Sequence, residues 1–370
     1  MRVGLFIDTH NLGGAEVVML ELAELLKLKS HEPVVMHFGN LYITQKCQAL
    51  GIENIILTNE LLYKKSMTLP VFCWNLSRQI RSLKLDVIHS HLTGAIICNA
   101  LTSLLSGTPH IGTLHDIYMV EENPRLLWAL KLSSWLGTRL IAVSNTTKQQ
   151  YVVKGISPKK IKTVLNCVPH RQQRSKSKLT KLDLGIPSDH CVFSTVARLV
   201  PLKRTDLLIK AFSKAFEHNP NIHLLIIGNG PELAKLKDIA SASLARKNIL
   251  FLGERGDVDV LLQLSDVFCL VSDSEGLSRS ILEAIANGLP IIATNVGGNV
   301  EIVTNNGLII ERGDTDGAMN AIKSLANSVE QRRNLAIKSK KLATTKLSSE
   351  SFVLNHIATY QSIIEQRVAQ

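Results

Sequence analysis

Two glutamates set eight residues apart, Glu275 and Glu283, are the residues of this sequence best suited to binding a ligand. A carboxylate accepts two hydrogen bonds, so it can hold the vicinal hydroxyls of a ribose or a hexose. Glu283 alone has an ordinary explanation, because Ser280 and Glu283 fit a capping box at a helix start. Glu275 does not fit that explanation, since it falls in the loop after an apolar strand. The pair therefore favours a sugar-containing ligand over helix capping alone.

The segment between the glutamates also suits an anion. Gly276, Leu277 and Ser278 would present backbone N–H groups beside a helix start, where the helix dipole favours negative charge. Arg198 and Lys203 follow an earlier apolar strand and could hold a diphosphate, the arginine as a planar fork and the lysine as a point charge. A solvated basic loop is the alternative for these two cations. Taken together, these residues predict a site for a sugar joined to a ribose through a diphosphate.

Two glycine-rich turns are further candidates for anion binding. Gly13 and Gly14 follow the first apolar strand and open a helix, where their N–H groups could approach an anion. A strand-to-helix turn that needs a positive φ explains them equally well. Gly228 and Gly230 are spaced as in the dinucleotide-binding fingerprint, but Leu233 stands where the third glycine would be. This difference disfavours a dehydrogenase.

Histidines follow two of the apolar strands in the first half of the chain. His115, in TLHD, lies at a strand end and is the best candidate for a polar side chain of a catalytic site. His89 and His91 fit such a role and also fit hydrogen-bonded core histidines. No carboxylates or cysteines recur at metal-ligand spacing, so we expect no metal site.

The elements that must position these residues alternate between short apolar strands and longer amphipathic helices. Continuous apolar strands alternating with helices indicate parallel sheets covered on both faces. The pattern breaks in a polar, basic stretch and then restarts, which predicts an α/β protein of two doubly wound, Rossmann-like domains facing a central cleft. The predicted boundaries are a first domain over 1–170, a linker over 171–186, a second domain over 187–348 and a C-terminal helix over 349–370 that packs back towards the first domain.

Composition narrows the class of protein and of partner. The 370 residues carry a net charge of +11, which favours anionic partners such as phosphorylated molecules, nucleic acid or anionic membranes. Aromatic residues are only 5%, and no nucleic-acid-binding motif is present, so we expect no nucleic acid partner. The six cysteines are scattered, as in reduced cytosolic proteins. No apolar run is long enough for a membrane span or a signal peptide, so the expected location is the cytoplasm.

Two segments mix basic and aromatic residues and could lie on a membrane. The first, over 61–85, includes Phe72 and Trp74, and the second, over 124–139, includes Trp128 and Trp135. The cationic residues of the first segment are Lys64, Lys65, Arg78, Arg81 and Lys84. Contact with anionic lipid at the inner face of the cytoplasmic membrane is one interpretation. A solvated helix face with Trp128 and Trp135 in the core is the other.

With these motifs in view, the chain resembles the retaining, GT-B-fold glycosyltransferases of family four, also called glycosyl transferases group 1, a family with many bacterial enzymes of polysaccharide and lipopolysaccharide synthesis. The resemblance covers almost the whole chain, and its motifs occur in the family's order. They are GGAE, DVIHSH, TLHD, AVSN, ARLVPLKR, IIGNGP, FLG, SEGLSRSILEAIANGLP and VGG. The two glutamates with seven residues between them are the most specific part.

The resemblance implies roles for the candidate residues. Arg198 and Lys203 would bind the donor's diphosphate and stabilise its charge as it leaves, Glu275 would contact the transferred sugar, and Glu283 the ribose. The remaining implied donor-site residues are Gly13, Gly14, Gly228, Leu252, Gly253, Gly276, Leu277 and Ser278. His115 would face the reacting sugar, and the catalytic set would be Glu275, His115, Lys203 and Arg198. The first domain would bind the acceptor.

The implied activity is transfer of a hexosyl unit, with retention, from a nucleotide-diphosphate sugar to a glycan or lipid-linked acceptor, without a metal or a cofactor. No carboxylate is an evident nucleophile, which favours front-side attack by the acceptor. The chain departs from the family at Asn166-Cys167-Val168-Pro169, where asparagine-glycine-valine-aspartate is common, so the turn there must differ. A sugar-nucleotide epimerase of the same fold and a non-enzymatic protein that binds anions or nucleic acid remain as alternatives.

Overall fold

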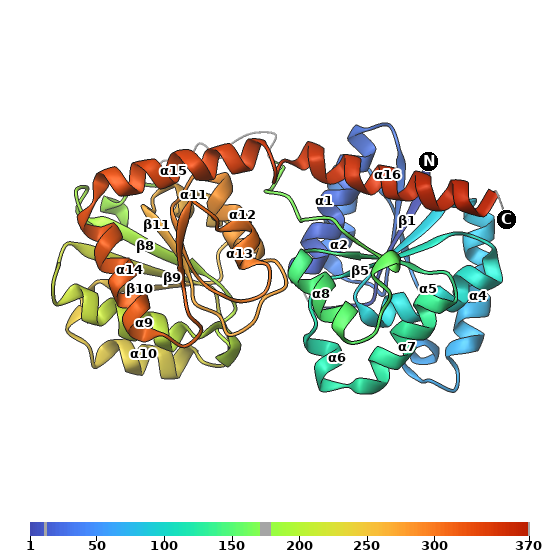
Figure 1. Cartoon of the computed structure of the whole chain (residues 1–370), viewed down its shortest axis with the longest axis horizontal. Helices are drawn as coiled ribbons and strands as arrows, with labels where there is room; N and C mark the ends of the chain where they lie inside the picture. Colours follow the sequence, from blue (N-terminus) through green and yellow to red (C-terminus); the bar gives the residue numbers. More distant parts are fainter. Residues whose placement is uncertain (11–12, 171–178, 369–370) are drawn as a thin grey trace. The chain divides into compact units, whose positions relative to one another are not determined.

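The computed structural model describes residues 1–10, 13–170 and 179–368. They form two compact units, one made of Met1–Asn166 with the C-terminal residues from Ser349 onward, and one of Cys167–Ser348. Each unit is an α/β domain built on one parallel sheet. Figure 1 shows the elements of both units. The predicted fold class of two doubly wound, Rossmann-like domains is confirmed.

The first unit has a seven-stranded sheet in which buried apolar residues run along the central strands. Its strands are β1 (Arg2–Ile7), β2 (Glu32–His37), β3 (Glu53–Ile56), β4 (Val87–His91), β5 (His110–Leu114), β6 (Arg139–Ala142) and β7 (Ile161–Thr163). They lie in the order β3-β2-β1-β4-β5-β6-β7. The order reverses direction between β1 and β4, which makes this the switch point where such sheets bind ligands. The three-residue β7 was not predicted, because it is too short to show a periodic signal.

Helices cover both faces of the first sheet. They are α1 (Gly14–Leu28), α2 (Leu41–Leu50), α3 (Glu60–Lys64), α4 (Leu69–Leu83), α5 (Thr93–Ser106), α6 (Tyr118–Glu122), α7 (Pro124–Trp135), α8 (Asn145–Val153), the 3-10 turn η1 (Pro158–Lys160) and α16 (Ser349–Val368). α4 and α5 pack together and bury Phe72 and Ala95 against β1 and β2. α16 contacts α1, and the hydroxyl of its Tyr360 is hydrogen-bonded to His89 of β4. The last helix of the chain therefore completes the core of the first unit.

The second unit has a six-stranded sheet with the same switch in strand order. Its strands are β8 (Cys191–Val196), β9 (Ile222–Ile227), β10 (Ile249–Gly253), β11 (Val267–Leu270), β12 (Ile291–Thr294) and β13 (Gly307–Ile310). The order is β10-β9-β8-β11-β12-β13, so the switch point lies between β8 and β11. The loops that follow these two strands carry Arg198, Lys203 and Glu275. The topology therefore places three of the predicted donor-site residues on neighbouring loops.

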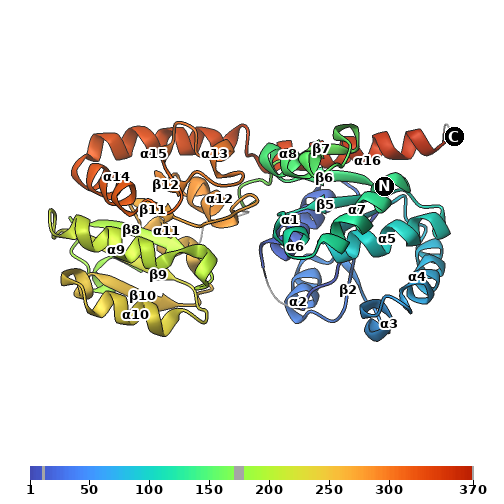
Figure 2. The ribbon, with the colours of Figure 1, turned by 60° about the horizontal axis from the view of Figure 1, so that its bottom comes forward.

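Helices also cover both faces of this second sheet (Figure 2). They are η2 (Leu182–Leu184), η3 (Pro201–Lys203), α9 (Thr205–Phe216), α10 (Leu233–Ser241), η4 (Leu244–Lys247), α11 (Val258–Gln263), α12 (Arg279–Ala286), α13 (Asn299–Ile302), α14 (Thr315–Asn327) and α15 (Val329–Thr344). α9 packs on α10 and α14 over the main core, which includes Phe193 and Phe212. α12 packs against α15. The sequence pattern predicts a helix over 315–327, and α14 has these bounds.

The boundaries between the units differ in detail from those predicted. The first part of the first unit ends at Asn166, and Cys167–Ser348 belongs to the second unit. The first eight residues of the predicted linker, 171–178, lie outside the described residues. The rest of it belongs to the second unit, because Ile186 is buried in a cluster with Val192, and Leu184 packs against that cluster. The stretch 179–186 has an apolar residue at every second or third position. This signal was overlooked because the residues before it are polar and basic.

Candidate active site

The centre of the site in the second unit is an ion pair between the two loops at the switch point. Lys203 Nζ lies 2.6 Å from Glu275 Oε1, and the two side chains are only 19% and 9% exposed. The loops are also joined by their backbones, because Asp273 N–H donates to the Leu202 carbonyl at 2.9 Å. The two residues are 72 positions apart in sequence. The parallel sheet brings them together, since both follow the carboxyl ends of adjacent strands.

A glycine pair after β12 supports the Glu275 loop. Gly297 has φ +52°, and a Cβ on it would lie 1.7 Å from the carbonyl oxygen of Glu275. Gly298 N–H donates to the Gly276 carbonyl at 2.7 Å. Only glycine allows both the left-handed backbone and this close approach. The VGG motif therefore holds the backbone of the predicted sugar-binding loop.

The helix that follows this loop begins two residues earlier than predicted. Ser278, not Ser280, is the N-cap of α12, and its hydroxyl accepts the Ile281 N–H at 3.3 Å. The predicted capping box of Ser280 with Glu283 is therefore wrong. Ser280 lies inside the first turn, with its hydroxyl 3.2 Å from that of Ser278. The capping interpretation thus no longer accounts for Glu283.

Glu283 lies on α12 as a half-buried carboxylate. Its Oε1 is 3.3 Å from Nε of Arg279, one turn earlier on the helix. Ahead of the helix, the N–H groups of Gly276, Leu277 and Ser278 donate to no acceptor within residues 1–10, 13–170 and 179–368. Buried backbone N–H groups are almost always paired, so three such groups at a helix N-terminus are suited to an anion.

The cations near the switch point differ in their partners. Arg198 is exposed and forms no ion pair with any described carboxylate. Arg204 lies between two carboxylates, with Nε 3.2 Å from Asp206 and Nη1 3.4 Å from Asp273. Those carboxylates raise the pKa of Arg204. Arg204 was not among the predicted residues, and its place beside Lys203 in KR is the only sequence signal for it.

The turn after β9 is fixed by backbone contacts. Gly228 has φ +133°, and its Cβ would lie 1.9 Å from the carbonyl oxygen of Ala197. Its N–H donates to the Gly253 carbonyl at 2.7 Å, and Gly253 itself has φ +68°. Leu252 precedes Gly253 at the end of β10 and is half-buried. Gly228 thus has a structural reason to be glycine that does not depend on a donor.

In the first unit, the GG motif starts α1 in a different way from the one predicted. Gly13 is the N-cap with φ −146°, and Gly14 is the first helical residue, so neither needs a positive φ. The Gly13 N–H donates to the buried carboxylate of Glu16 at 2.7 Å. The alternative of a turn that requires left-handed glycine is therefore wrong. An anion here would have to share this N-terminus with Glu16.

His115 is half-buried at the end of β5 and is joined to His91. His91 Nδ1 and His115 Nε2 are 3.0 Å apart. Burial lowers the pKa of His115 to about 4, so its ring is neutral at pH 7. Burial also lowers the pKa of His91 well below its usual value, with His115 adding to the shift. Between two neutral rings at this distance, the N–H of one ring donates a hydrogen bond to the unprotonated nitrogen of the other. This hydrogen bond fixes the orientation of His115.

His89 is a core histidine. One ring nitrogen lies 2.7 Å from the Tyr360 hydroxyl and the other 2.7 Å from Thr113 Oγ1, so both are satisfied inside the unit. His89 is fully buried, and burial lowers its pKa well below the usual value. Of the two alternatives left open for His89, the structural one is confirmed.

Asp8 and Tyr63 are polar residues at the same sheet edge that the sequence did not indicate. The Tyr63 hydroxyl donates to Asp8, which follows β1 at the switch point. Burial raises the pKa of Asp8. A lone carboxylate after a first strand carries no motif, and its partner is far away in sequence, so only the structure could show the pair.

The sequence predicts no metal site and leaves two interpretations of the aromatic segments open. No group of three or more His, Cys, Asp or Glu side chains that could hold a metal occurs among the residues described. Trp128 and Trp135 are 72% and 79% exposed on α7, so the alternative interpretation that places them in the core is wrong. Trp74 on α4 is also exposed. Within the described residues, no helix is both long and apolar enough to cross a membrane.

Comparison with protein families decides the class of this protein. A family model described as Glycosyltransferase Family 4 matches residues 12–172, and one described as Glycosyl transferases group 1 matches residues 177–342. The chain belongs to the group 1 glycosyltransferases. It is therefore an enzyme of the transferase class, as the motifs predicted.

Individual relatives agree with this assignment. The chain is 29% identical to an Escherichia coli protein named UDP-Gal:alpha-D-GlcNAc-diphosphoundecaprenol alpha-1,3-galactosyltransferase, over 70% of this chain and 74% of that one. It is 26% identical to the N-acetyl-alpha-D-glucosaminyl L-malate synthase of Bacillus anthracis, over 96% and 95% of the two chains. The crystal structure of Anabaena Alr3699/HepE in complex with UDP aligns with a TM-score of 0.86 and 20% identity, covering 98% of this chain and 100% of the other. That likeness shows the GT-B fold.

Proposed function

We propose that this glycosyltransferase moves a hexosyl unit, with retention, from a nucleotide-diphosphate sugar to a glycan or lipid-linked acceptor in cell-surface polysaccharide or lipopolysaccharide synthesis. The observation that carries the donor side is the Lys203–Glu275 ion pair beside the unpartnered N–H groups of 276–278. A cation, a carboxylate and helix-terminal amides meet there at the switch point. This combination suits a phosphate joined to a polyhydroxylated sugar.

The proposed roles follow from charge. A diphosphate gains negative charge as it leaves the sugar, and preorganised cations and amide dipoles compensate that charge. Arg198 and Lys203 supply the cations, and Glu275 and Glu283 accept hydrogen bonds from hydroxyls of the sugar and the ribose. In the first unit, His115 presents a neutral ring, which donates or accepts a hydrogen bond without adding charge.

Two observations support the choice of acceptor. The name of the Escherichia coli relative contains a sugar on diphosphoundecaprenol, a lipid-linked acceptor. The net charge of +11 favours an acceptor that carries phosphate. The Bacillus anthracis relative names L-malate instead, so small carboxylates form the second class of acceptor to assay.

Thermal unfolding with UDP, GDP, ADP and CMP tests the donor side. A nucleotide at about a hundred times its dissociation constant stabilises the folded state by roughly 2.7 kcal/mol, a shift in Tm of several degrees. We expect one nucleotide diphosphate to give this shift in the wild type and to lose it in Glu283→Ala. Glu311→Ala is the matched control, because Glu311 is exposed in the same unit and its carboxylate accepts a hydrogen bond only from Asn295 among the described residues. Shifts that are equal in both variants would contradict the assignment of Glu283.

We further propose that catalysis needs no metal ion, because Lys203, Arg198 and the start of α12 supply the positive charge. Transfer measured in excess EDTA should then proceed at the rate found without it. A loss of activity in EDTA that magnesium restores would overturn this part of the proposal. A turnover of donor without acceptor would instead favour the epimerase alternative.

The first unit is proposed to contact an anionic membrane surface through α7. Trp128, Leu132 and Trp135 are exposed at spacings of four and three residues, so they share one face of the helix. Lys131 lies over the Trp128 ring at 5.0 Å, which places a cation beside the apolar face. Aromatic and basic side chains together suit the lipid interface.

Co-sedimentation with vesicles tests this surface. Wild type should bind vesicles that contain phosphatidylglycerol more than vesicles of phosphatidylcholine alone, and Trp128→Ala/Trp135→Ala should lose most of that binding. Leu41→Ala is the control for removing an exposed apolar side chain elsewhere in the same unit, on α2. Binding that does not depend on anionic lipid or on α7 would refute the membrane contact.

A further inference from the structure

A second cationic site lies at the edge of the first sheet opposite to His115. Two adjoining cavities, of about 290 and 450 Å³, open where β5, β6 and β7 begin, and the C-terminal part of α16 forms one side of both. They share Arg139, Lys160 and Gln366 in their linings. Because parallel strands all begin at the same edge, this place is separate from the carboxyl edge that carries the candidate active site.

The polar lining of these cavities is strongly positive. Arg139 and Lys160 line both cavities, Arg367 lines the first, and Lys159 and Lys162 line the second. Among the described residues, no carboxylate lines either cavity. Like charges gathered without a counter-charge repel one another, so this arrangement is most stable when an anion is bound. A structural role alone does not account for five cations at one place.

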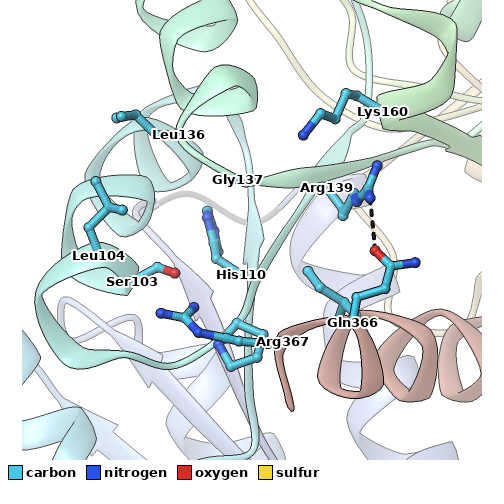
Figure 3. Close-up of a pocket in the computed structure, with 11 residues that line it drawn as sticks. Ser103, Leu104, His110, Leu136, Gly137, Arg139, Lys160, Gln366 and Arg367 are labelled. Atoms are coloured by element: carbon cyan, nitrogen blue, oxygen red, sulfur yellow. Dashed lines mark hydrogen bonds between the residues drawn. The ribbon is translucent and has the colours of Figure 1, made fainter. Parts of the chain in front are cut away.

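Arg139 is held in position and keeps free donors. Its Nη1 donates to the Lys159 carbonyl at 3.2 Å and its Nη2 to Gln366 at 2.8 Å, which uses two of the five N–H groups of a guanidinium. Figure 3 shows Arg139, Lys160 and Arg367 reaching the cavity from three separate segments. Burial and the charge of Arg139 lower the pKa of Lys160. The geometry thus provides one fixed fork with two further cations around it.

The first cavity also has uncharged residues in its lining, including an apolar wall. Leu104, Leu136 and Ile363 line the first cavity, and Leu136 follows the exposed Trp135. His110 lines it too, but its ring nitrogens lie 2.9 Å from Thr138 Oγ1 and Ser90 Oγ, and burial lowers its pKa to about 3. His110 is therefore a neutral structural residue. The cations of this site suit any phosphate, and its apolar wall would additionally suit a phosphate on an apolar carrier.

We propose that these cavities bind a phosphate-bearing ligand, held by Arg139, Lys160 and Arg367. Arginine forks and lysine point charges are the usual protein partners of phosphate oxygens. The phosphate comes either from a lipid headgroup or from a soluble molecule, and the two sources share this chemistry. The site is distinct from the donor site, so the proposal does not depend on the proposed function.

The experiment uses the full chain, inorganic pyrophosphate and vesicles of phosphatidylcholine with and without phosphatidylglycerol. The test variant is Lys160→Gln/Arg367→Gln, which keeps Arg139 and its two bonds in place. The control is Lys29→Gln/Lys46→Gln, which removes two exposed charges from the same unit. Calorimetric titration measures pyrophosphate, and co-sedimentation measures the vesicles. Pyrophosphate at the donor site contributes equally to both variants, so the difference between them belongs to the cavity.

We expect the test variant to bind its probe at least about tenfold more weakly than the control, since each charged hydrogen bond contributes about that factor. A difference seen with pyrophosphate identifies a soluble phosphate, and one seen only with phosphatidylglycerol vesicles identifies a lipid headgroup. Equal binding by the two variants with both probes would overturn the proposal, as would no binding by the wild type. Loss of nucleotide binding in Glu283→Ala has no bearing on either result.

Discussion

At the scale of single residues, Lys203 and Glu275 depend on each other. Because both side chains are largely buried, removing the lysine leaves a carboxylate without its partner. We expect Lys203→Met to lower the free energy of unfolding by about 1–3 kcal/mol. Lys203→Met/Glu275→Gln should recover much of this stability, because it removes the unpaired charge, while transfer activity stays low. Urea unfolding and a transfer assay of the two variants make the comparison. Equal stability of wild type and single variant would mean that solvent screens the pair.

The residue scale also shows what could be predicted from the sequence. Glu275, Glu283, Lys203 and Arg198 could be proposed from the sequence because their types suit a sugar–diphosphate ligand and the strands before their loops are easy to recognise. The 2.6 Å contact between Lys203 and Glu275 was not predicted, since it depends on which two strands are neighbours at the switch point. The pairing of Asp8 with Tyr63 was also missed, because Tyr63 is far from Asp8 in the sequence and only the fold brings the two together.

At the scale of elements, the start of α12 gives a direct test of the corrected cap. Ser278→Ala should lower stability by about 1 kcal/mol, because its hydroxyl accepts the Ile281 N–H. Ser280→Ala should change it by much less, since that residue lies within the helix, where alanine is favourable. Thermal unfolding of the two variants makes the measurement. A larger loss in Ser280→Ala would restore the capping box that the sequence suggested.

The loop that carries Glu275 can be displaced without touching the carboxylate. In Gly297→Ala the new Cβ would lie 1.7 Å from the Glu275 carbonyl oxygen, so the two loops must separate. We expect the nucleotide-induced shift in Tm to be lost. Gly313→Ala is the control: Gly313 also has a positive φ, +76°, but its Cβ would meet nothing within 4 Å. That variant should lose only about 1 kcal/mol of stability and keep its response to nucleotide. Equal loss of the response in both would count against a role for the VGG motif.

The helices also show why burial is harder to predict than the elements themselves. The apolar strands and α14 were recognised because period and composition agree. In α7, Trp128 and Trp135 fit a core face by residue type alone, and the structure exposes both. The buried face of that helix is instead formed by Leu130, Ser133 and Ser134. Small polar residues facing the core give no hydrophobic signal, so the orientation of the helix could not be predicted from it.

At the scale of the whole molecule, the two units repeat one design with different chemistry. Each sheet reverses its strand order once, and each places polar residues on the loops at that point. The second unit gathers cations and carboxylates there, around Lys203 and Glu275. The first presents Asp8, His91 and the half-buried His115 at its corresponding edge. The second unit thus offers paired charges where a donor is proposed to bind, and the first offers two neutral imidazole rings beside Asp8 where an acceptor is proposed to bind.

The same division predicts that acid destabilises the first unit before the second. Burial lowers the pKa of seven histidines in the first unit, namely His31, His37, His89, His91, His110, His115 and His356, but of His223 alone among the described histidines of the second. In the unfolded chain these rings bind protons near pH 6.5, whereas in the folded chain His110, with a pKa of about 3, and His115 and His356, with pKa values of about 4, stay neutral well below that pH. The unfolded state therefore binds more protons in this interval, and the stability present above pH 6.5 is lost as the pH falls towards 4. Hydrogen exchange with mass spectrometry, corrected for the intrinsic rate at each pH, should show peptides of β4, β5 and α16 losing protection at higher pH than those of β8, β9 and β11. Parallel loss in both units would show that the buried histidines do not control acid stability.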